Sequence, residues 1–193
     1  MLFRKDNLAD RKILISYFGY ILLTVYLGYF LFWIYDNISL FLCSDLFTEL
    51  MFADLQAKTK DFFVETWFYS TEIRVINMQL VYTPLFLIFN DWEKILFVGI
   101  FIWMLIYVFS FLFLYRRLKL SMTWFPYFSV ILICPLNWEY IYFVEAGNYY
   151  LPFLCITMWT LALMLPILDK EKNKKWVLAS NALLSVILAF VSS

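Results

Sequence analysis

A run of 23 residues without a charge, Ile13–Tyr35, constrains the fold of this chain more than any other feature of its sequence. At about 1.5 Å per helical residue, the run is long enough to cross the roughly 30 Å hydrocarbon core of a bilayer. Basic residues precede the run, as they do in a signal peptide. Its apolar part is too long for one, however, and no small-residue cleavage site follows it, so we expect a retained membrane anchor.

The rest of the chain is nearly as apolar. Of the 193 residues, 64% are hydrophobic and 23% are aromatic, which is more apolar side chain than a soluble domain of this length can bury. We therefore expect an all-α fold, a polytopic helical membrane protein with about five transmembrane helices in a single domain. The predicted spans are residues 13–35, 95–115, 122–140, 149–168 and 176–191.

The basic residues predict the orientation of these spans. Eleven of the 15 Lys and Arg residues lie before the first span, between the second and third, and between the fourth and fifth, which is one side of the membrane. The positive-inside tendency makes that side cytoplasmic, so we expect a multi-pass plasma-membrane protein with a cytoplasmic N-terminus and its first loop outside. Eleven of the 15 acidic residues then lie outside, although acidic residues contribute little to topology.

Two residue types limit the chemistry. The chain has no histidine, which excludes His-dependent catalytic triads and His-ligated metals or haem. Its three cysteines, Cys43, Cys134 and Cys155, have no paired or CxxC spacing, so they indicate neither a zinc site nor a disulfide framework. Any acid–base catalysis would therefore depend on carboxylates.

The first outer loop, residues 36–92, begins with a predicted surface helix at about residues 44–57, SDLFTELMFADLQA. Ser44 can cap this helix and Asp45 lies in its positive first turn. Asp45 and Glu49 are four positions apart and so project from one face, where like charges repel slightly and do not help the helix. The pair is either a solvated helix face at the lipid boundary or part of a functional site.

A second amphipathic stretch occupies about residues 70–89 and carries Glu72 and Arg74 in its first turns. We expect an interfacial or re-entrant helix here, because Glu72 and Arg74 would be costly at the membrane centre and a sixth span would upset the sidedness of the basic residues. These two residues either form a structural ion pair or cap, or bind a ligand.

The second outer loop, Asn137–Pro152, is short and carries Glu139 and Glu145 among tyrosines that include Tyr149 and Tyr150. The tyrosines suit an interfacial aromatic belt, and the two glutamates suit either a hydrated loop or a ligand site.

The order of these elements resembles the N-terminal part of GT-C-type membrane glycosyltransferases. The segments SDLFTELMFADLQ, TWFYSTEIRVINMQLVYTPLFLIFNDW and NWEYIYFVEAGNYYLP are similar to those of multi-span bacterial proteins with this architecture, and the resemblance extends from Asp45 to Pro152. It implies a cell-envelope enzyme that transfers a sugar from a polyprenyl-phosphate donor to an acceptor on the outer face of the membrane.

The resemblance also implies roles for residues. Asp45 and Glu49 would be the catalytic residues, with Asp45 as general base or acceptor-orienting group. Either a divalent cation, Mg²⁺ or Mn²⁺, would be held by Asp45, Glu139 and Glu145, or the site would have no cofactor and Arg74 would pair with the phosphate. The substrate and its phosphate would be bound by Arg74, Glu72, Tyr149 and Tyr150.

The chain has fewer spans than full GT-C modules, so we expect either a truncated module or a membrane partner that supplies further helices. The alternative function is a non-catalytic membrane subunit or a component of a small-molecule transporter. Ion-driven transport is disfavoured because the predicted spans carry almost no ionisable residue, only Glu139 lying near the end of one. The basic clusters have a topological explanation, so nucleic acid is not an expected partner.

Overall fold

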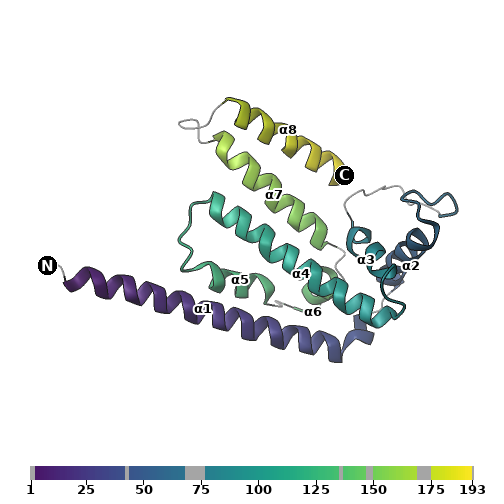
Figure 1. The fold of residues 1–193 in the computed structure, drawn as a ribbon, viewed down its shortest axis with the longest axis horizontal. Helices are drawn as coiled ribbons and strands as arrows, with labels where there is room; N and C mark the ends of the chain where they lie inside the picture. The colour runs from purple at the N-terminus through teal and green to yellow at the C-terminus, as the bar shows by residue number, and fades with distance from the viewer. Residues whose placement is uncertain are drawn as a thin grey trace.

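The computed structural model describes residues 3–41, 44–67, 77–134, 137–146, 150–168 and 175–192. Every regular element within these ranges is helical, as expected (Figure 1). Four helices are long: α1 (Phe3–Asp36), α4 (Trp92–Arg117), α7 (Leu151–Leu168) and α8 (Lys175–Ser192). α4 packs on α7, and α7 packs on α8.

Within the described ranges, two helices are long and apolar enough to cross a membrane. They are Asp10–Asp36 of α1, with a mean hydropathy of 1.7, and α4, with a mean hydropathy of 2.6. The apolar part of α7, Leu151–Leu165, is shorter. The predicted spans at 13–35 and 95–115 therefore coincide with helices that meet this requirement, whereas the five-span topology remains a prediction.

The described basic residues among those singled out in the sequence lie toward one end of the arrangement of helices. In Figure 1 the start of α1, the end of α4, the end of α7 and the start of α8 lie toward one side of the molecule, and α2 and α3 lie at the other. We call these the basic end and the α2–α3 end. Arg116, Arg117 and Lys119 belong to the basic end, in agreement with the clustering read from the sequence.

The capping of α4 explains where this helix begins. The carboxylate of Asp91 accepts hydrogen bonds from the backbone N–H groups of Glu93, at 3.1 Å, and Lys94, at 3.3 Å, and forms an ion pair with Lys94 at 3.1 Å. The hydrogen bond from the Lys94 side chain, followed by that from its backbone N–H, holds the pKa of Asp91 below its usual 3.8. The helix runs without interruption to Arg117.

The span predicted for residues 122–140 is not a single helix in the described part of the chain. The structure has a nine-residue helix, α5 (Phe125–Ile133), then the three-residue α6 (Trp138–Tyr140) and the π-helix η2 (Ile141–Ala146). Cys134 leaves the helical region, with a ψ of 119°, because the ring of Pro135 disfavours a helical conformation in the preceding residue. At about 1.5 Å per residue, α5 spans only about half of a hydrocarbon core.

Tyrosine hydroxyls donate hydrogen bonds to the carbonyl groups at the end of α5. Tyr26 of α1 donates to the carbonyl of Ile133 at 3.4 Å, and Tyr140 of α6 donates to the carbonyl of Leu132 at 2.8 Å. The hydroxyl of Tyr107 in α4 lies 3.2 Å from that of Tyr140. The interrupted helix is therefore connected to its neighbours by hydrogen bonds at the point where its own ladder stops.

In the predicted first outer loop, the described residues form two helices, α2 (Ser44–Thr59) and α3 (Gln79–Phe86), which pack on each other and, through α3, on α4. α2 closely matches the predicted helix at 44–57. α3 is shorter than the predicted 70–89: residues 70–76 lie outside the described part, and Leu87 and Ile88 bond to the carbonyls three residues before them, so the helix tightens and ends.

One glycine sets the contact between α3 and α4. The ring of Tyr82 is fully buried against Gly99 of α4, and a Cβ atom at Gly99 would lie 2.6 Å from Cζ of that ring. Only a residue without a side chain allows this approach. This contact sets how closely α3 approaches α4.

Candidate functional site

The α2–α3 end carries a carboxylate that is oriented by two amide side chains. Glu49 lies at the edge of the buried stripe of α2 and is itself partly buried. Its Oε2 accepts a hydrogen bond from Nε2 of Gln79 and another from Nδ2 of Asn77 at 3.5 Å. Both amides are buried, with exposed fractions of 7% and 8%, so they cannot turn freely to water. Glu49 is therefore fixed in one orientation.

A second polar contact joins the same two helices two turns further along. Oγ1 of Thr83 donates to Oε1 of Gln56 at 2.8 Å, and Nε2 of Gln56 donates to the carbonyl of Phe62 at 2.7 Å. Gln56 is 95% buried, so both bonds lie in a desolvated setting, where they count for more than at the surface. The two contacts define how α2 and α3 lie against each other.

Apolar packing supports this arrangement. Leu46, Leu50, Ala53 and Ala57 form the buried stripe of α2, at the spacing of a helix face. At its edge, Phe47 stacks on Trp92 at the start of α4, with ring centroids 5.4 Å apart. α2 is thus part of a packed unit with α3 and α4, in addition to having an exposed apolar side.

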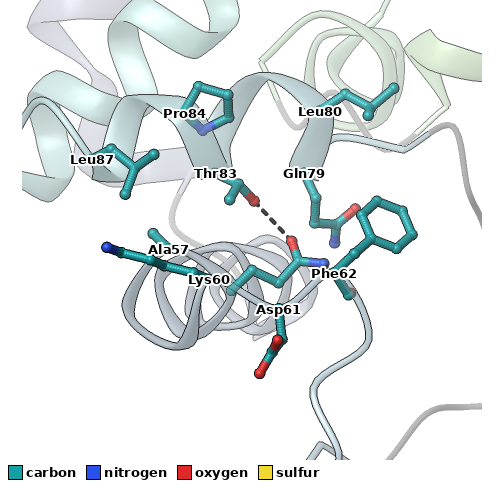
Figure 2. A pocket seen from close by; sticks show the side chains of 10 residues that line it. Ala57, Lys60, Asp61, Phe62, Gln79, Leu80, Thr83, Pro84 and Leu87 are labelled. Carbon is teal, nitrogen blue, oxygen red and sulfur yellow. Dashed lines mark hydrogen bonds between the residues drawn. The ribbon is translucent and has the colours of Figure 1, made fainter.

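Between α2 and α3 lies a cavity of about 380 Å³ (Figure 2). Its walls combine apolar side chains, among them Ala57, Phe62, Leu80 and Leu87, with the polar or charged side chains of Gln56, Gln79, Thr83, Lys60 and Asp61. Gln79 is shared: its amide nitrogen bonds to Glu49 and its side chain lines the cavity. This size and lining are typical of small-molecule sites.

Lys60 lies at the end of α2 in a left-handed conformation, with a φ of 60°. Its backbone N–H donates to the carbonyl of Gln56 at 2.8 Å, which closes the last turn of the helix. Glycine fits this position with least strain, so the backbone alone does not account for a lysine here.

The start of the predicted second outer loop approaches the segment before α2. Phe41, at the end of the 3₁₀ helix η1 (Ile38–Phe41), stacks on Trp138 of α6 with ring centroids 5.8 Å apart. Glu139 follows Trp138 and is exposed. The contact brings the helix that carries Glu139 near the segment that leads into Asp45.

The predicted site residues are described to different degrees. Asp45 and Glu145 belong to described helices, but their side chains lie outside what the structure describes, as do Glu72, Arg74 and Tyr149 altogether. Tyr150 is exposed immediately before α7. Of the predicted set, only Glu49 is placed with its side-chain partners.

The predicted metal site remains a prediction. Among the described side chains, no three Asp, Glu or Cys residues lie close enough together to hold a metal ion. Two of the three predicted ligands, Asp45 and Glu145, are not among those side chains.

Sequence reasoning did not identify the partners of Glu49 or the role of Gln56. Asn77 and Gln79 are visible as polar residues in an apolar stretch, and Gln56 interrupts the apolar stripe of α2. Such interruptions indicate a buried amide that must find a partner, but the partner lies 27 to 30 residues away and becomes apparent only in the folded chain.

The chain was compared with protein-family models, with curated proteins and with solved structures, and no match was found in any of the three.

Proposed function

We propose that this chain is a membrane glycosyltransferase that transfers a sugar from a polyprenyl-phosphate donor to an acceptor at its α2–α3 end. The observation that carries the proposal is the carboxylate of Glu49, oriented by Asn77 and Gln79 on a helix that also bears Asp45 one turn earlier. A purely solvated helix face has no need for two buried amides that fix one of its carboxylates.

The proposal places the α2–α3 end outside the membrane and the basic end in the cytoplasm. Five segments would cross the bilayer, with the interrupted α5–α6–η2 segment as the third. Two helices of sufficient length and the grouping of described basic residues at the opposite end support this topology. Donor lipid in the outer leaflet would then reach α2 and α3 directly.

In the proposed reaction, Asp45 accepts the proton of the acceptor hydroxyl as that oxygen bonds to the anomeric carbon of the sugar. The bond from this carbon to the phosphate oxygen breaks, and polyprenyl phosphate leaves with the electron pair. Glu49 positions Asp45 and the acceptor from the next turn of α2. Arg74 pairs with the phosphate of the leaving group.

Carboxylate oxygens are the ligands that Mg²⁺ and Mn²⁺ prefer, so Asp45, Glu139 and Glu145 fit such a cation chemically. The stacking of Phe41 on Trp138, which brings α6 to the start of α2, supports the grouping. A bound cation would neutralise charge on the phosphate of the donor.

Native mass spectrometry of the purified chain with undecaprenyl phosphate, with and without Mn²⁺, tests this proposal. We expect one lipid to bind, with an affinity that Mn²⁺ changes and that Asp45→Asn and Glu49→Gln alter. Glu65→Gln is the matched control, because Glu65 is an exposed acid of the same loop. If both site variants bind the lipid as the wild type and the control do, the donor site is not here.

A non-catalytic membrane subunit is the second candidate, favoured by the apolar surface of α1. Most side chains of its apolar segment are exposed, including Leu14, Phe18 and Phe32. Lipid covers such a surface in a monomer, and helices of another protein cover it in a complex. Crosslinking from Phe18→Cys in intact cells would separate the two: a single defined adduct supports the subunit, and lipid exposure alone supports the monomer.

A further inference from the structure

The cavity between α2 and α3 lies next to Glu49, but its lining is partly apolar, whereas the described contacts of the Glu49 carboxylate are with amide groups. One wall is apolar and ends in side chains that are themselves exposed: Leu80, at 48%, and Leu87, at 64%. Ile88, which follows Leu87, is also exposed, at 70%. The apolar wall is therefore continuous with an apolar outer edge of α3, which offers a hydrocarbon chain a path from a bilayer into the cavity.

The polar wall carries two charged residues, Lys60 and Asp61, which form no ion pair with each other, and the carboxylate of Asp61 points away from α3. Three lysines are described at this end of the molecule. Lys58 pairs with Asp54 at 2.6 Å and Lys94 pairs with Asp91 at 3.1 Å, whereas Lys60 has no ion-pair partner among the described residues. In Figure 2 the side chains of Lys60 and its neighbour Asp61 point in different directions.

Charge and shape therefore favour a ligand with one anionic group and one hydrocarbon chain. Gln56 and Thr83 already form a hydrogen bond with each other. An anionic group in the cavity would therefore have Lys60 as its charged partner and the amide of Gln79 as a polar neighbour. A volume of about 380 Å³ is at the lower end of the range for ligand pockets, and it holds one hydrocarbon chain in part, with the remainder in the bilayer.

We infer that this cavity binds an anionic glycerophospholipid of the outer leaflet, with its phosphate on Lys60 and part of one acyl chain between α2 and α3. Such a lipid ties the α2–α3 unit to the membrane surface and holds the cavity beside Gln79, whose amide orients Glu49. The inference relies on the membrane location in the proposed function, but it does not require sugar transfer.

Native mass spectrometry with phosphatidylglycerol tests the inference, and phosphatidylcholine with the same acyl chains serves as the neutral comparison. We expect phosphatidylglycerol to bind the wild type about tenfold more tightly than phosphatidylcholine, as a charge-assisted contact would provide. Lys60→Gln should remove that preference. Lys94→Gln should keep it, because Lys94 is paired with Asp91 and does not line the cavity.

Two further variants examine the apolar wall. Ala57→Leu should fill the cavity and weaken both lipids, and Leu87→Asn should do the same from an exposed position that folding does not require. The inference is overturned if Lys60→Gln keeps the preference, if Lys94→Gln loses it equally, or if both wall variants bind phosphatidylglycerol normally.

A competition experiment separates this site from the donor site. Excess undecaprenyl phosphate should leave phosphatidylglycerol bound to the wild type, and Asp45→Asn should not affect phosphatidylglycerol. If undecaprenyl phosphate displaces phosphatidylglycerol completely, the cavity belongs to the donor and the phospholipid site is wrong. If phosphatidylglycerol binds as expected while undecaprenyl phosphate does not bind at all, the phospholipid site is supported and the proposed transferase fails.

Discussion

The close approach of α3 to α4 predicts opposite effects for the same substitution at two glycines. Gly99→Ala would place a methyl group 2.6 Å from Cζ and 2.7 Å from Cδ1 of Tyr82, whereas carbon atoms normally approach no closer than about 3.5 Å. The ring has no space to retreat, because Tyr82 is fully buried. At Gly28, in the exposed part of α1, an added methyl group meets no atom within 4 Å.

The magnitudes follow from two opposing effects. Overpacking in a close-packed interior costs about 1–3 kcal/mol, and replacing glycine by alanine within a helix returns up to about 1 kcal/mol. Gly99→Ala should therefore lower the free energy of unfolding by about 1 kcal/mol, and Gly28→Ala should raise it by up to about 1 kcal/mol. For a chain of this length, each kcal/mol moves Tm by about 2–4 °C.

Thermal unfolding in detergent, followed by circular dichroism, measures both shifts. Adding Tyr82→Ala to each background completes a double-mutant cycle, and Gly99→Ala should no longer be destabilising once the ring is absent. The reasoning is refuted if Gly99→Ala raises Tm as Gly28→Ala does, or if its cost is the same with and without the Tyr82 ring.

Three further predictions concern charge, backbone and topology. Asp91→Asn keeps the helix cap but removes the charge, so the variant should be less stable than the wild type near neutral pH. Because folding lowers the pKa of Asp91, this difference in stability should disappear as the pH falls through and below 3.8. The free energy of unfolding as a function of pH measures it. Lys60→Gly should raise the free energy of unfolding by about 0.5–1 kcal/mol, since glycine adopts a positive φ without strain, and an unchanged or lower Tm would contradict this. In intact cells, a membrane-impermeant maleimide should label Asp61→Cys directly and Lys119→Cys only after permeabilisation; the reverse order would invert the topology.

The sequence predicted an element correctly where a single local requirement, such as length or apolar spacing, determines it. The length of an uncharged run predicts α1 and α4, because a span must be both long and apolar, and the helical spacing of Leu46, Leu50 and Ala53 predicts α2. Both signals are local and strong. The bounds of α2 differ from the prediction by two residues at one end only.

The interruption after α5 was not predicted, although Pro135 is plain in the sequence. Proline is tolerated in membrane helices when neighbouring side chains satisfy the freed backbone groups, so its presence alone does not decide between a kink and a break. Here the tyrosines of α1 and α6 satisfy carbonyls at the end of α5, and the tyrosine of α4 bonds to that of α6; these contacts exist only in the folded chain.

The prediction of the candidate site was likewise limited because its contacts join residues that are far apart in the sequence. The spacing of Asp45 and Glu49 places them on one face of α2 from sequence alone. The contacts of Glu49 with Asn77 and Gln79 connect residues that are 28 and 30 positions apart, and they depend on α3 packing through Tyr82 onto Gly99. No local pattern encodes a contact of that kind.

The tyrosine hydroxyls at the end of α5 have a consequence for solvent. In a soluble protein, water would bond to the last carbonyls of a helix, and an interruption in apolar surroundings would draw water inward. Here Tyr26 and Tyr140 donate to the carbonyls of Ile133 and Leu132 in place of such water molecules, so side chains of the protein itself satisfy the end of α5. Replacing either tyrosine with phenylalanine would open this point to hydration, at the depth where α1, α4 and α5 meet.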